Sequence, residues 1–309
     1  MQNLLRNAIL AVAEREEIEQ VIRRGRIPRA LAGRFVAGDT DSDALRAAKL
    51  LAASGLTATL DHLGENVLTS SEANAAVRSY ETSLRGMRAA GLEPNISVKL
   101  TMLGLDISND AAYENMRLLL QTARKVQGFV RIDMEGSDYT ERTVAITESL
   151  HDAFPNHVGT VIQAYLHRAD RDVERLNERG IRVRLVKGAY AEPASVALQR
   201  PREIDAAFVR LMERLLEHGR YPAIATHDPA LIRATRGFAT RLGIDRGGWE
   251  FQMLYGVRRD AQLALAGEGY GMRIYVPFGT DWYSYFARRI AERPANMVFV
   301  LRQLASGWH

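Results

Sequence analysis

Residues 271–296 read GMRIYVPFGTDWYSYFARRIAERPAN and contain the unit that decides the fold. The apolar run Arg273–Val276 predicts a short strand, and the Pro-Phe-Gly sequence that follows predicts a turn. Thr280 or Asp281 can cap a helix after this turn, because their side-chain oxygens accept hydrogen bonds from the first backbone N–H groups. Pro294 ends that helix, since proline cannot continue one. The stretch therefore predicts a strand followed directly by a helix.

The predicted helix carries two adjacent cations beside an aromatic ring. Tyr285, Arg288, Arg289 and Glu292 stand at i, i+3, i+4 and i+7 and therefore share one face. Guanidinium groups bind carboxylates through paired, charge-assisted hydrogen bonds, so this face suits a small carboxylate ligand. A solvated helix face with an Arg–Glu pair is the alternative interpretation.

The same strand–helix unit recurs along the chain. Strands that alternate with helices are parallel and are joined by crossovers, and eight such units over about 250 residues are the size of a (β/α)8 barrel. The predicted strands are Thr57–Asp61, Asn95–Leu100, Phe129–Met134, Gly159–Tyr165, Arg182–Lys187, Pro222–His227, Trp249–Leu254 and Met272–Val276. Amphipathic segments between them include Glu72–Ala89, Ala111–Val126, Arg202–His218 and Pro229–Arg241.

The predicted fold is therefore α/β: a (β/α)8 TIM-type barrel with extra N-terminal helices and an eighth helix over the active site. We expect a single domain of residues 1–309, with N-terminal helices in residues 1–56 and the barrel in residues 57–309. A doubly wound sheet is the competing layout. The phosphate-binding GxGxxG loop of that fold is missing after the first strand, which favours the barrel.

Composition excludes several classes of function. The 309 residues are 47% hydrophobic and 25% charged, as in ordinary globular proteins, and no apolar run is long enough to span a bilayer. The glutamate-rich N-terminal segment predicts an amphipathic helix and not a signal peptide. The chain has no cysteine, which excludes disulfides and thiolate chemistry and agrees with a cytoplasmic location. Its net charge of +4 is spread evenly, unlike the basic stripe of a nucleic-acid-binding protein.

Polar residues follow the predicted strands at their carboxyl ends, where barrel enzymes carry their active sites. In the fifth strand Arg182, Arg184 and Val186 share one face, while Val183, Leu185 and Lys187 share the other. Because barrel interiors hold apolar layers, an inward charge indicates function. The candidates are Lys99, Asp133, Gln163, Arg184, Thr226, His227, Glu250, Gln252 and Tyr275.

Each of these candidates also has a structural interpretation. Lys99 and Asp133 could form an ion pair between neighbouring strands, His227 could be a capping or core histidine, and Lys187 could be a surface lysine. We predict no metal site, because HExxH is absent and the seven histidines are scattered. No G-x-S-x-G elbow for a serine nucleophile is present.

Six segments of the chain resemble the proline dehydrogenase family in its short, monofunctional bacterial form. They occur in the order of the family and fall on the predicted strand ends. They are SVKLTMLG (97–104), IDMEGSDYT (132–140), RLVKGAY (184–190), ATHD (225–228), EFQMLYG (250–256) and YVPFGTDWYSYFARRIAERPAN (275–296). The resemblance implies a (β/α)8 barrel that binds FAD, with the eighth helix over the substrate.

The resemblance also implies an activity. L-Proline would be oxidised to Δ1-pyrroline-5-carboxylate, with hydride passing to flavin N5 and electrons passing on to a membrane quinone. A quinone acceptor implies peripheral contact with the inner face of the cell membrane. By the same resemblance the catalytic residues would be Asp133, Arg184 and Tyr275. The substrate would contact Lys99, Tyr190, Leu254, Tyr275, Tyr285, Arg288 and Arg289.

The FAD-binding residues are likewise implied by the resemblance. They are Met134, Gln163, Arg184, Val186, Lys187, Gly188, Ala189, Tyr190, Thr226, His227 and Gln252. Arg184 would lie near flavin N5, and Asp133 would orient Lys99 or assist the amine. Asp228 departs from the larger bifunctional relatives, which tend to have asparagine there. An ion pair between Glu65 and Arg289 would close the site as a gate.

Two other functions are compatible with the residues alone. A Schiff-base aldolase could use Lys187 or Lys99 as its nucleophile, since lysines at barrel strand ends do such chemistry. A carboxylate-binding barrel without enzymatic activity is the other. A bound flavin would distinguish the dehydrogenase from both.

Overall fold

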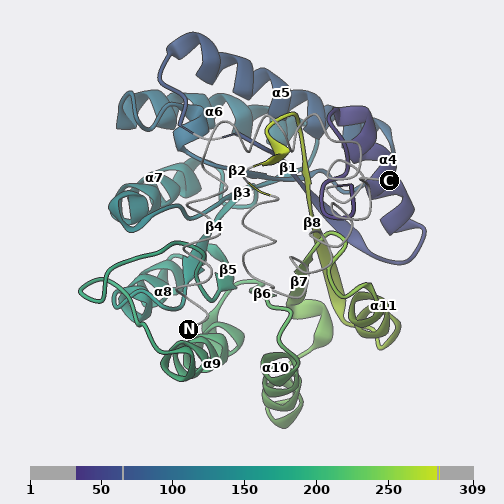
Figure 1. Cartoon of the computed structure of the whole chain (residues 1–309), viewed down its shortest axis with the longest axis vertical. Helices are drawn as coiled ribbons and strands as arrows, with labels where there is room; N and C mark the ends of the chain where they lie inside the picture. Colours follow the sequence, from purple (N-terminus) through teal and green to yellow (C-terminus); the bar gives the residue numbers. More distant parts are fainter. Residues whose placement is uncertain (1–32, 65, 284, 286–309) are drawn as a thin grey trace, which may run out of the picture.

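The computed structural model describes residues 33–64, 66–283 and 285. Within them, eight strands form a closed barrel in the order β1 to β8, and every neighbouring pair is parallel. The strands are β1 (Thr57–His62), β2 (Asn95–Val98), β3 (Phe129–Ile132), β4 (Val158–Gln163), β5 (Arg182–Val186), β6 (Ala223–Ala225), β7 (Glu250–Leu254) and β8 (Gly271–Phe278). Figure 1 looks into the barrel, with the helices arranged around the strands. The predicted (β/α)8 barrel is confirmed.

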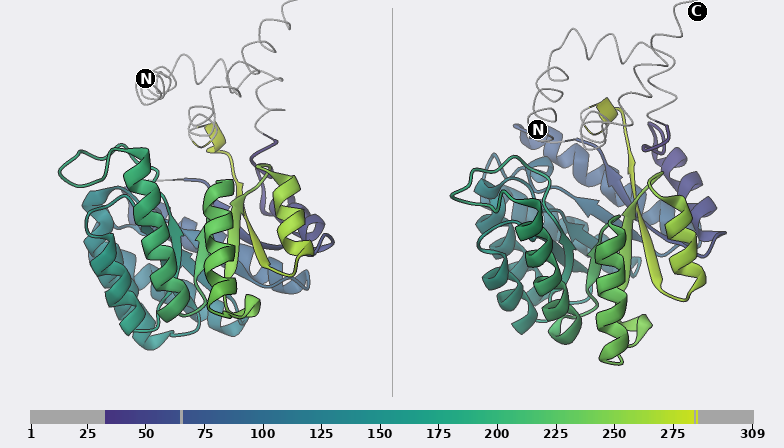
Figure 2. Two further views of the ribbon diagram at one scale, coloured as in Figure 1. Left: turned by 90° about the horizontal axis from the view of Figure 1, so that it is seen from below. Right: turned by 60° about the horizontal axis from the view of Figure 1, so that its bottom comes forward.

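Helices surround the barrel, as the side views of Figure 2 show. Thr40 and Thr69 each accept a hydrogen bond from the third backbone N–H of the helix that follows, and they form capping boxes with Asp43 and Glu72. The helices are α4 (Asp41–Ala52), α5 (Ser70–Ala89), α6 (Asn109–Lys125), α7 (Ser137–Ala153), α8 (Ala169–Glu178), α9 (Pro201–His218), α10 (Pro229–Arg241) and α11 (Arg259–Gly267). Two short 3-10 helices, η1 (Thr101–Leu103) and η2 (Arg246–Gly248), lie between them.

Helix α4 occupies the place in the outer ring between α11 and α5 (Figure 1). It packs against β1 and β8. The segment before it forms two hydrogen bonds with β8 and the residue after it, from Ala37 N–H to Pro277 C=O and from Gly279 N–H to Gly38 C=O, both 2.9 Å. A helix from the N-terminal part thus closes the ring where the helix after β8 would lie in a regular barrel. Residues 1–32 and the predicted eighth helix from 286 onward lie outside the described residues, and the single-domain division stays a prediction.

Several strands end earlier than predicted at the mouth of the barrel. β2 ends at Val98 and not at Leu100, and β3 ends at Ile132 and not at Met134. Asp133 N–H still donates to Val98 C=O at 2.8 Å, after which the two chains separate and η1 begins. The polar residues that follow each strand therefore leave the sheet, because parallel pairing stops where the loops diverge around the site.

Charged side chains also fill the interior at the amino ends of the strands, where apolar layers were expected. Arg131 is 2% exposed and donates to the carbonyl oxygens of Thr160 and Arg182. The Arg182 guanidinium lies over the rings of Phe129 and Tyr221, 4.3 and 4.4 Å from their centroids. An inward charge in this barrel is therefore not by itself a sign of catalysis, because carbonyl groups and aromatic rings support some of these arginines.

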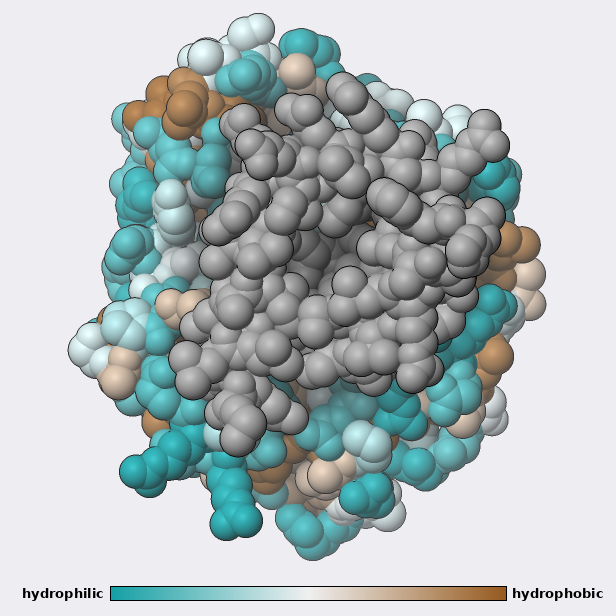
Figure 3. Space-filling view, viewed as in Figure 1, coloured by the Kyte–Doolittle hydropathy of each residue, from teal (hydrophilic) through white to brown (hydrophobic). Residues whose placement is uncertain are grey.

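The described residues visible around the margin of Figure 3 are mainly hydrophilic, with apolar residues in separate small patches. Large exposed apolar side chains come from different helices and loops, as with Leu50, Leu68 and Leu242. In the described ranges, we find no helix that combines the length and the apolar character needed to cross a membrane.

An ion-pair network joins α7 to α8 on the surface and leads to a stability prediction. Glu141 accepts hydrogen bonds from Arg168 and, at 3.0 Å, from Arg175, and these bonds lower the pKa of Glu141 from 4.5 to about 2. Because the folded pKa lies below the unfolded value, the bonds stabilise the fold above about pH 4.5 and are lost as the pH falls toward 2. Glu141 is 54% exposed, so solvent screening limits the stabilisation to about 1 kcal/mol.

Glu141→Gln should therefore lower the melting temperature at pH 7 by about 2 °C. The difference from the wild type should shrink as the pH falls below 4.5. Glu174→Gln, at an exposed glutamate of α8, is the control and should change the melting temperature less. A pH-independent difference, measured by thermal denaturation followed by circular dichroism, would contradict this assignment.

Candidate active site

A cavity of about 470 Å³ opens at the carboxyl ends of the strands. All the predicted site residues within the described part of the chain except the candidate Glu250 line it, although the predictions came from seven different strand ends and the loops after them. These residues are Lys99, Asp133, Met134, Gln163, Arg184, Val186, Lys187, Gly188, Ala189, Tyr190, Thr226, His227, Gln252, Leu254, Tyr275 and Tyr285. Glu65, Arg288 and Arg289 lie outside the described residues. The structure thus gathers the candidates in one place, and their roles stay predictions.

Arg184 is the centre of the buried part of this cavity. Its Nε donates to Gln252 Oε1, one terminal nitrogen donates to Asp133 Oδ1 at 2.7 Å, and the other donates to Ser97 Oγ at 3.0 Å. The guanidinium carbon lies 5.3 Å from the centre of the Tyr275 ring. Since the planar group is held in three directions, its orientation toward the cavity is fixed.

Asp133 connects Arg184 to Tyr275. The second carboxylate oxygen accepts a hydrogen bond from the Tyr275 hydroxyl at 2.8 Å. Burial raises the pKa of Asp133, and the charge of Arg184 opposes this rise. Burial raises the pKa of Tyr275 well above its usual value, and the carboxylates of Asp133 and Asp61 raise it further. Tyr275 therefore stays a neutral donor, and the carboxylate of Asp133 has a donor on each oxygen.

Asp61 is a site residue that the sequence interpretation missed. It is 1% exposed, lines the cavity, and lies 3.5 Å from Lys99 Nζ. We expected Asp133 to orient Lys99 or to assist the amine, and this role stays a prediction; the structure adds Asp61 as a carboxylate at ion-pair distance from Lys99. The signal was present in the sequence, because Asp61 ends the predicted strand Thr57–Asp61. In the structure it is the next-to-last residue of β1 and pairs in register with Ser97, two residues before Lys99. A carboxylate at the end of a buried parallel strand belongs to the site as much as the cations do.

The segment after β5 packs closely over Tyr165, and Gly188 makes this approach feasible. Gly188 has a φ of +134°, and a Cβ atom there would lie 2.4 Å from the Tyr165 ring. The Tyr165 hydroxyl donates to Tyr190 C=O at 3.2 Å, and Gln163 Oε1 accepts from Ala189 N–H at 3.1 Å. Gly188 was predicted as an FAD-binding residue, and the structure gives a reason for a glycine at this position, which is the close approach of the Tyr165 ring.

Lys187 points away from Arg184, toward the helices, as the alternation of the strand predicts. Its Nζ lies 2.5 Å from Asp205 Oδ1 on α9 and 3.0 Å from Asp228 Oδ2 at the start of α10. Burial lowers the pKa of Lys187, but the hydrogen bonds to Asp205 and Asp228 outweigh this effect and raise it. A protonated amine is not a nucleophile, so this geometry disfavours Lys187 as a Schiff-base lysine.

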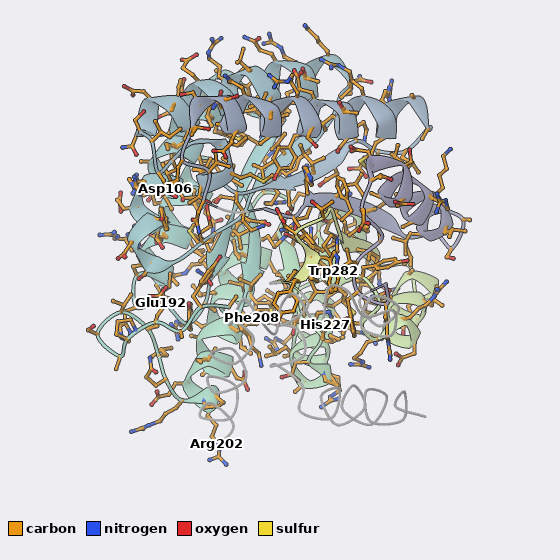
Figure 4. The ribbon with its side chains drawn as sticks, turned by 45° about the horizontal axis from the view of Figure 1, so that its top comes forward. Asp106, Glu192, Arg202, Phe208, His227 and Trp282 are labelled. Atoms are coloured by element: carbon orange, nitrogen blue, oxygen red, sulfur yellow. The ribbon has the colours of Figure 1, made fainter. Side chains whose placement is uncertain are left out.

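His227 lies at the cavity and also connects two strands (Figure 4). Its Nε2 accepts a hydrogen bond from Leu254 N–H at 2.9 Å, and its C=O accepts one from Arg258 at 3.0 Å. An imidazole nitrogen that accepts from a backbone N–H is not protonated on that atom. The structural interpretation of His227 is therefore supported, together with its position on the cavity wall.

The chain closely matches proteins of known family. The family model for proline dehydrogenase matches residues 44–302. Proline dehydrogenase 1 of Bacillus subtilis is 44% identical over 271 residues, which cover 88% of this chain and 89% of that protein. The proline dehydrogenase of Deinococcus radiodurans is 38% identical over 311 residues, covering 99% of this chain and 100% of the relative.

A solved structure of a larger protein has the same fold. The crystal structure of proline utilization A from Bdellovibrio bacteriovorus, inactivated by N-propargylglycine, matches with a TM-score of 0.80 at 26% identity. The match covers 94% of this chain but only 37% of that one. The chain therefore corresponds to one part of this larger protein and to nearly the whole of the monofunctional relatives.

The fold and the site together define a barrel enzyme whose buried cations and carboxylates converge at the strand ends. The chain belongs to the proline dehydrogenase family, as the family model and the monofunctional bacterial relatives show. It is accordingly an oxidoreductase that acts on the CH–NH group of its donor.

Proposed function

We propose that the protein oxidises L-proline to Δ1-pyrroline-5-carboxylate with bound FAD and passes the electrons on to a membrane quinone. The observation that carries the proposal is the Arg184–Asp133–Tyr275 network inside the cavity of a chain that is 44% identical to a proline dehydrogenase. The relatives are named proline dehydrogenases, and this name specifies proline as their substrate.

The side chains that line the cavity support FAD as the cofactor by their chemistry. It extends from Arg184 and Tyr275 near the barrel axis to Gly188 and Thr226 at the rim between β5 and β6. When bound, FAD would supply the acceptor for a hydride. A fixed cation such as Arg184 favours the electron-rich reduced form of a flavin. The residues proposed to hold FAD are Met134, Gln163, Arg184, Val186, Lys187, Gly188, Ala189, Tyr190, Thr226, His227 and Gln252.

The substrate residues would act mainly by positioning. Lys99 supplies a cation for the proline carboxylate, and Arg288 and Arg289 would complete the clamp from outside the described residues. Apolar and aromatic side chains on the cavity wall, Tyr190, Leu254, Tyr275 and Tyr285, would pack against the ring and exclude water. Holding the reacting carbon in place can supply about 7–11 kcal/mol of a barrier.

The oxidation removes a hydride from the ring carbon next to nitrogen and leaves a C=N bond, and the proton lost from that nitrogen passes to solvent water. Asp133 would stabilise positive charge on the nitrogen as the bond forms, because its carboxylate is buried and held by Arg184 and Tyr275. In this scheme Asp133 need not itself accept the proton.

The quinone acceptor places the enzyme at a membrane. We propose a cytoplasmic protein with peripheral contact at the inner face of the cell membrane. We also propose that an ion pair between Glu65 and Arg289 closes over the site as a gate. Both residues lie outside the described ranges, so the gate stays a proposal.

The close contact at Gly188 gives a prediction for cofactor binding. Gly188→Ala must move either Tyr165 or the segment that lines the cavity, since the new Cβ would lie 2.4 Å from the ring. Strain of about 1–3 kcal/mol should weaken FAD binding by roughly 5- to 150-fold. Titration of apoprotein with FAD, followed by flavin fluorescence, measures the effect.

Gly243→Ala is the matched control for this prediction. Gly243 also has a positive φ of +65°, but a Cβ there would meet no atom within 4 Å. Equal FAD affinities in both variants would show that the contact with Tyr165 does not shape the cofactor site.

Identification of the cofactor tests the proposal against its alternative. The purified protein should release FAD on denaturation, recognised by its mass, and should reduce a soluble quinone when L-proline is added. A Schiff-base aldolase that uses Lys99 or Lys187 would instead be trapped on the lysine by borohydride in the presence of a carbonyl substrate. Release of no flavin, together with borohydride trapping, would replace the proposed function with the aldolase.

A further inference from the structure

A chain of buried side chains runs through the barrel interior from the amino ends of the strands to the cavity. Arg273 on β8 donates from a terminal nitrogen to Glu93 at 3.0 Å and from Nε to Glu250 Oε1 at 3.0 Å. Gln252 Nε2 donates to Glu250 Oε1 at 2.5 Å, and Arg184 Nε donates to Gln252 Oε1. Gln252 and Arg184 line the cavity, whereas the lining residues do not include Glu250 or Arg273.

The hydrogen bonds in this chain have a fixed direction. A carboxylate only accepts hydrogen bonds, so the amide of Gln252 must turn its NH2 group toward Glu250. Its carbonyl oxygen then faces Arg184 and accepts from Nε. Glu250 and Arg184 together therefore fix the direction of the Gln252 amide, and the charge of Glu250 strengthens the hydrogen bond that anchors it.

The pair of Glu250 and Arg273 is costly as a purely structural element. The two residues are 2% and 3% exposed, and taking two charges out of water costs several kcal/mol per ion. Buried ion pairs can often be replaced by apolar residues without loss of stability. Although burial alone would raise the pKa of Glu250, Arg273 and Gln252 outweigh it and lower that pKa, so Glu250 stays a carboxylate.

We propose that Glu250, held by Arg273, is a positioning residue of the oxidation site: it sets the direction of the Gln252 amide and thereby the orientation of Arg184 in the cavity. This inference rests on the proposed function, because it assigns the effect to a flavin that Arg184 faces. Glu250 acts through two other side chains and need not touch substrate or cofactor.

Glu250→Gln tests how firmly the chain is held. One oxygen of Glu250, Oε1, accepts from both Arg273 Nε and Gln252 Nε2, so the new amide can keep its oxygen at this position. The hydrogen bond to Gln252 then loses its charge assistance and becomes weaker. The carbonyl oxygen of Gln252 is therefore held less firmly in front of Arg184 Nε, and the orientation of Arg184 is less fixed.

The sign of the change in flavin potential separates the competing accounts. If Glu250 positions Arg184, the variant should stabilise the reduced form of its flavin less well. The equilibrium constant for two-electron reduction should fall at least tenfold, which lowers the flavin reduction potential by about 30 mV. If Glu250 acts only as a distant negative charge, its removal should raise the potential. An upward shift, or none, in the folded and flavin-loaded variant overturns the proposal.

Two matched variants complete the test. Glu148→Gln removes another buried carboxylate, which accepts two hydrogen bonds from Arg175 on the outer helices, and it should change thermal stability but not the flavin potential. In an Arg184→Lys background, Glu250→Gln should cause little further shift, because lysine has no Nε–H to orient. A full shift in that background contradicts action through Arg184.

Gln252→Met serves if Glu250→Gln fails to fold. It interrupts the chain but leaves the Glu250–Arg273 pair intact, and it should also lower the potential by about 30 mV. An unchanged potential would overturn the proposal.

The wild type is measured first. A wild-type protein that holds no flavin, or whose bound flavin is not reduced by proline, counts against the proposed function. In that case the positioning is tested by NMR on the Arg184 Nε–H resonance, which is assigned by its loss in Arg184→Lys. This resonance should still shift in Glu250→Gln and should not shift in Glu148→Gln. An unchanged resonance in Glu250→Gln would overturn the positioning role.

Discussion

Replacing Arg184 with methionine should lower the rate of flavin reduction by proline by about 100- to 1,000-fold. Removal of one fixed group that stabilises developing charge in a buried site has an effect of this size. The variant loses a cation beside the proposed flavin and leaves Asp133 with one fewer donor in a buried position. We expect weaker FAD retention and a lower flavin potential as well. Stopped-flow reduction at saturating proline and potentiometric titration measure the two effects.

Arg182→Met is the matched control for this prediction. Arg182 lies on the same strand and the same face as Arg184, but at the amino end, where it stacks on Phe129 and Tyr221. Its loss should reduce stability and leave the rate of the folded, flavin-loaded enzyme within about twofold of the wild type. Equal losses of rate in both variants would show that the effect comes from the barrel interior in general and not from the site.

Replacing Asp133 with asparagine should lower kcat/KM for proline by about 100-fold. The amide can offer an oxygen to Arg184 or to Tyr275, but not an acceptor to both, and the buried guanidinium loses its counter-charge. The wild type should also lose activity at low pH as Asp133 takes up a proton, and because burial raises its pKa this loss should begin above the usual value of 3.8. The acidic limb of the profile should disappear in the variant.

A second tyrosine–aspartate pair outside the cavity provides the control. The Tyr139 hydroxyl donates to Asp106 at 2.8 Å on the exposed rim, where Asp106 is labelled in Figure 4. Asp106→Asn should leave kcat/KM and its pH profile close to those of the wild type. A profile in Asp133→Asn that keeps the acidic limb would assign that limb to another group.

The barrel could be predicted from the sequence because its determinants are local. The helix Pro229–Arg241 was predicted at its observed bounds, since Asp228 caps it and Pro229 begins it. The ends of β2 and β3 could not be predicted, because a strand ends where its neighbour diverges, and that depends on both loops. The place of α4 between β8 and β1 depends on packing between segments far apart in the sequence.

The candidate site was predictable to the extent that it follows the strand ends. Parallel strands bring their carboxyl ends together, so Arg184 and Tyr275 had to lie near each other once the barrel was assumed. The pairing of charges was not predictable. Lys99 and Asp133 are on adjacent strands, yet Lys99 pairs with Asp61 from the other side, and Asp133 reaches across to Arg184. Which partner a buried charge selects depends on side-chain directions within the closed barrel.

The charged amino end of the interior was missed for a different reason. We expected Glu250 among the candidates at the carboxyl end of its strand and Arg273 within an apolar run, whereas Glu250 begins β7 and Arg273 lies near the start of β8. Their strands are neighbours, but Glu93, which completes the cluster, lies in the loop before β2. A pattern of alternating residues in one strand does not reveal a cluster assembled from three parts of the chain.

Anaerobic titration of the flavin-loaded protein with L-proline tests the central claim most directly. The account predicts that the absorbance of the oxidised flavin disappears as proline is added and that Δ1-pyrroline-5-carboxylate appears in equal amount, since one two-electron oxidation reduces one flavin. A flavin that stays oxidised at saturating proline, while a chemical reductant bleaches it, would contradict the account.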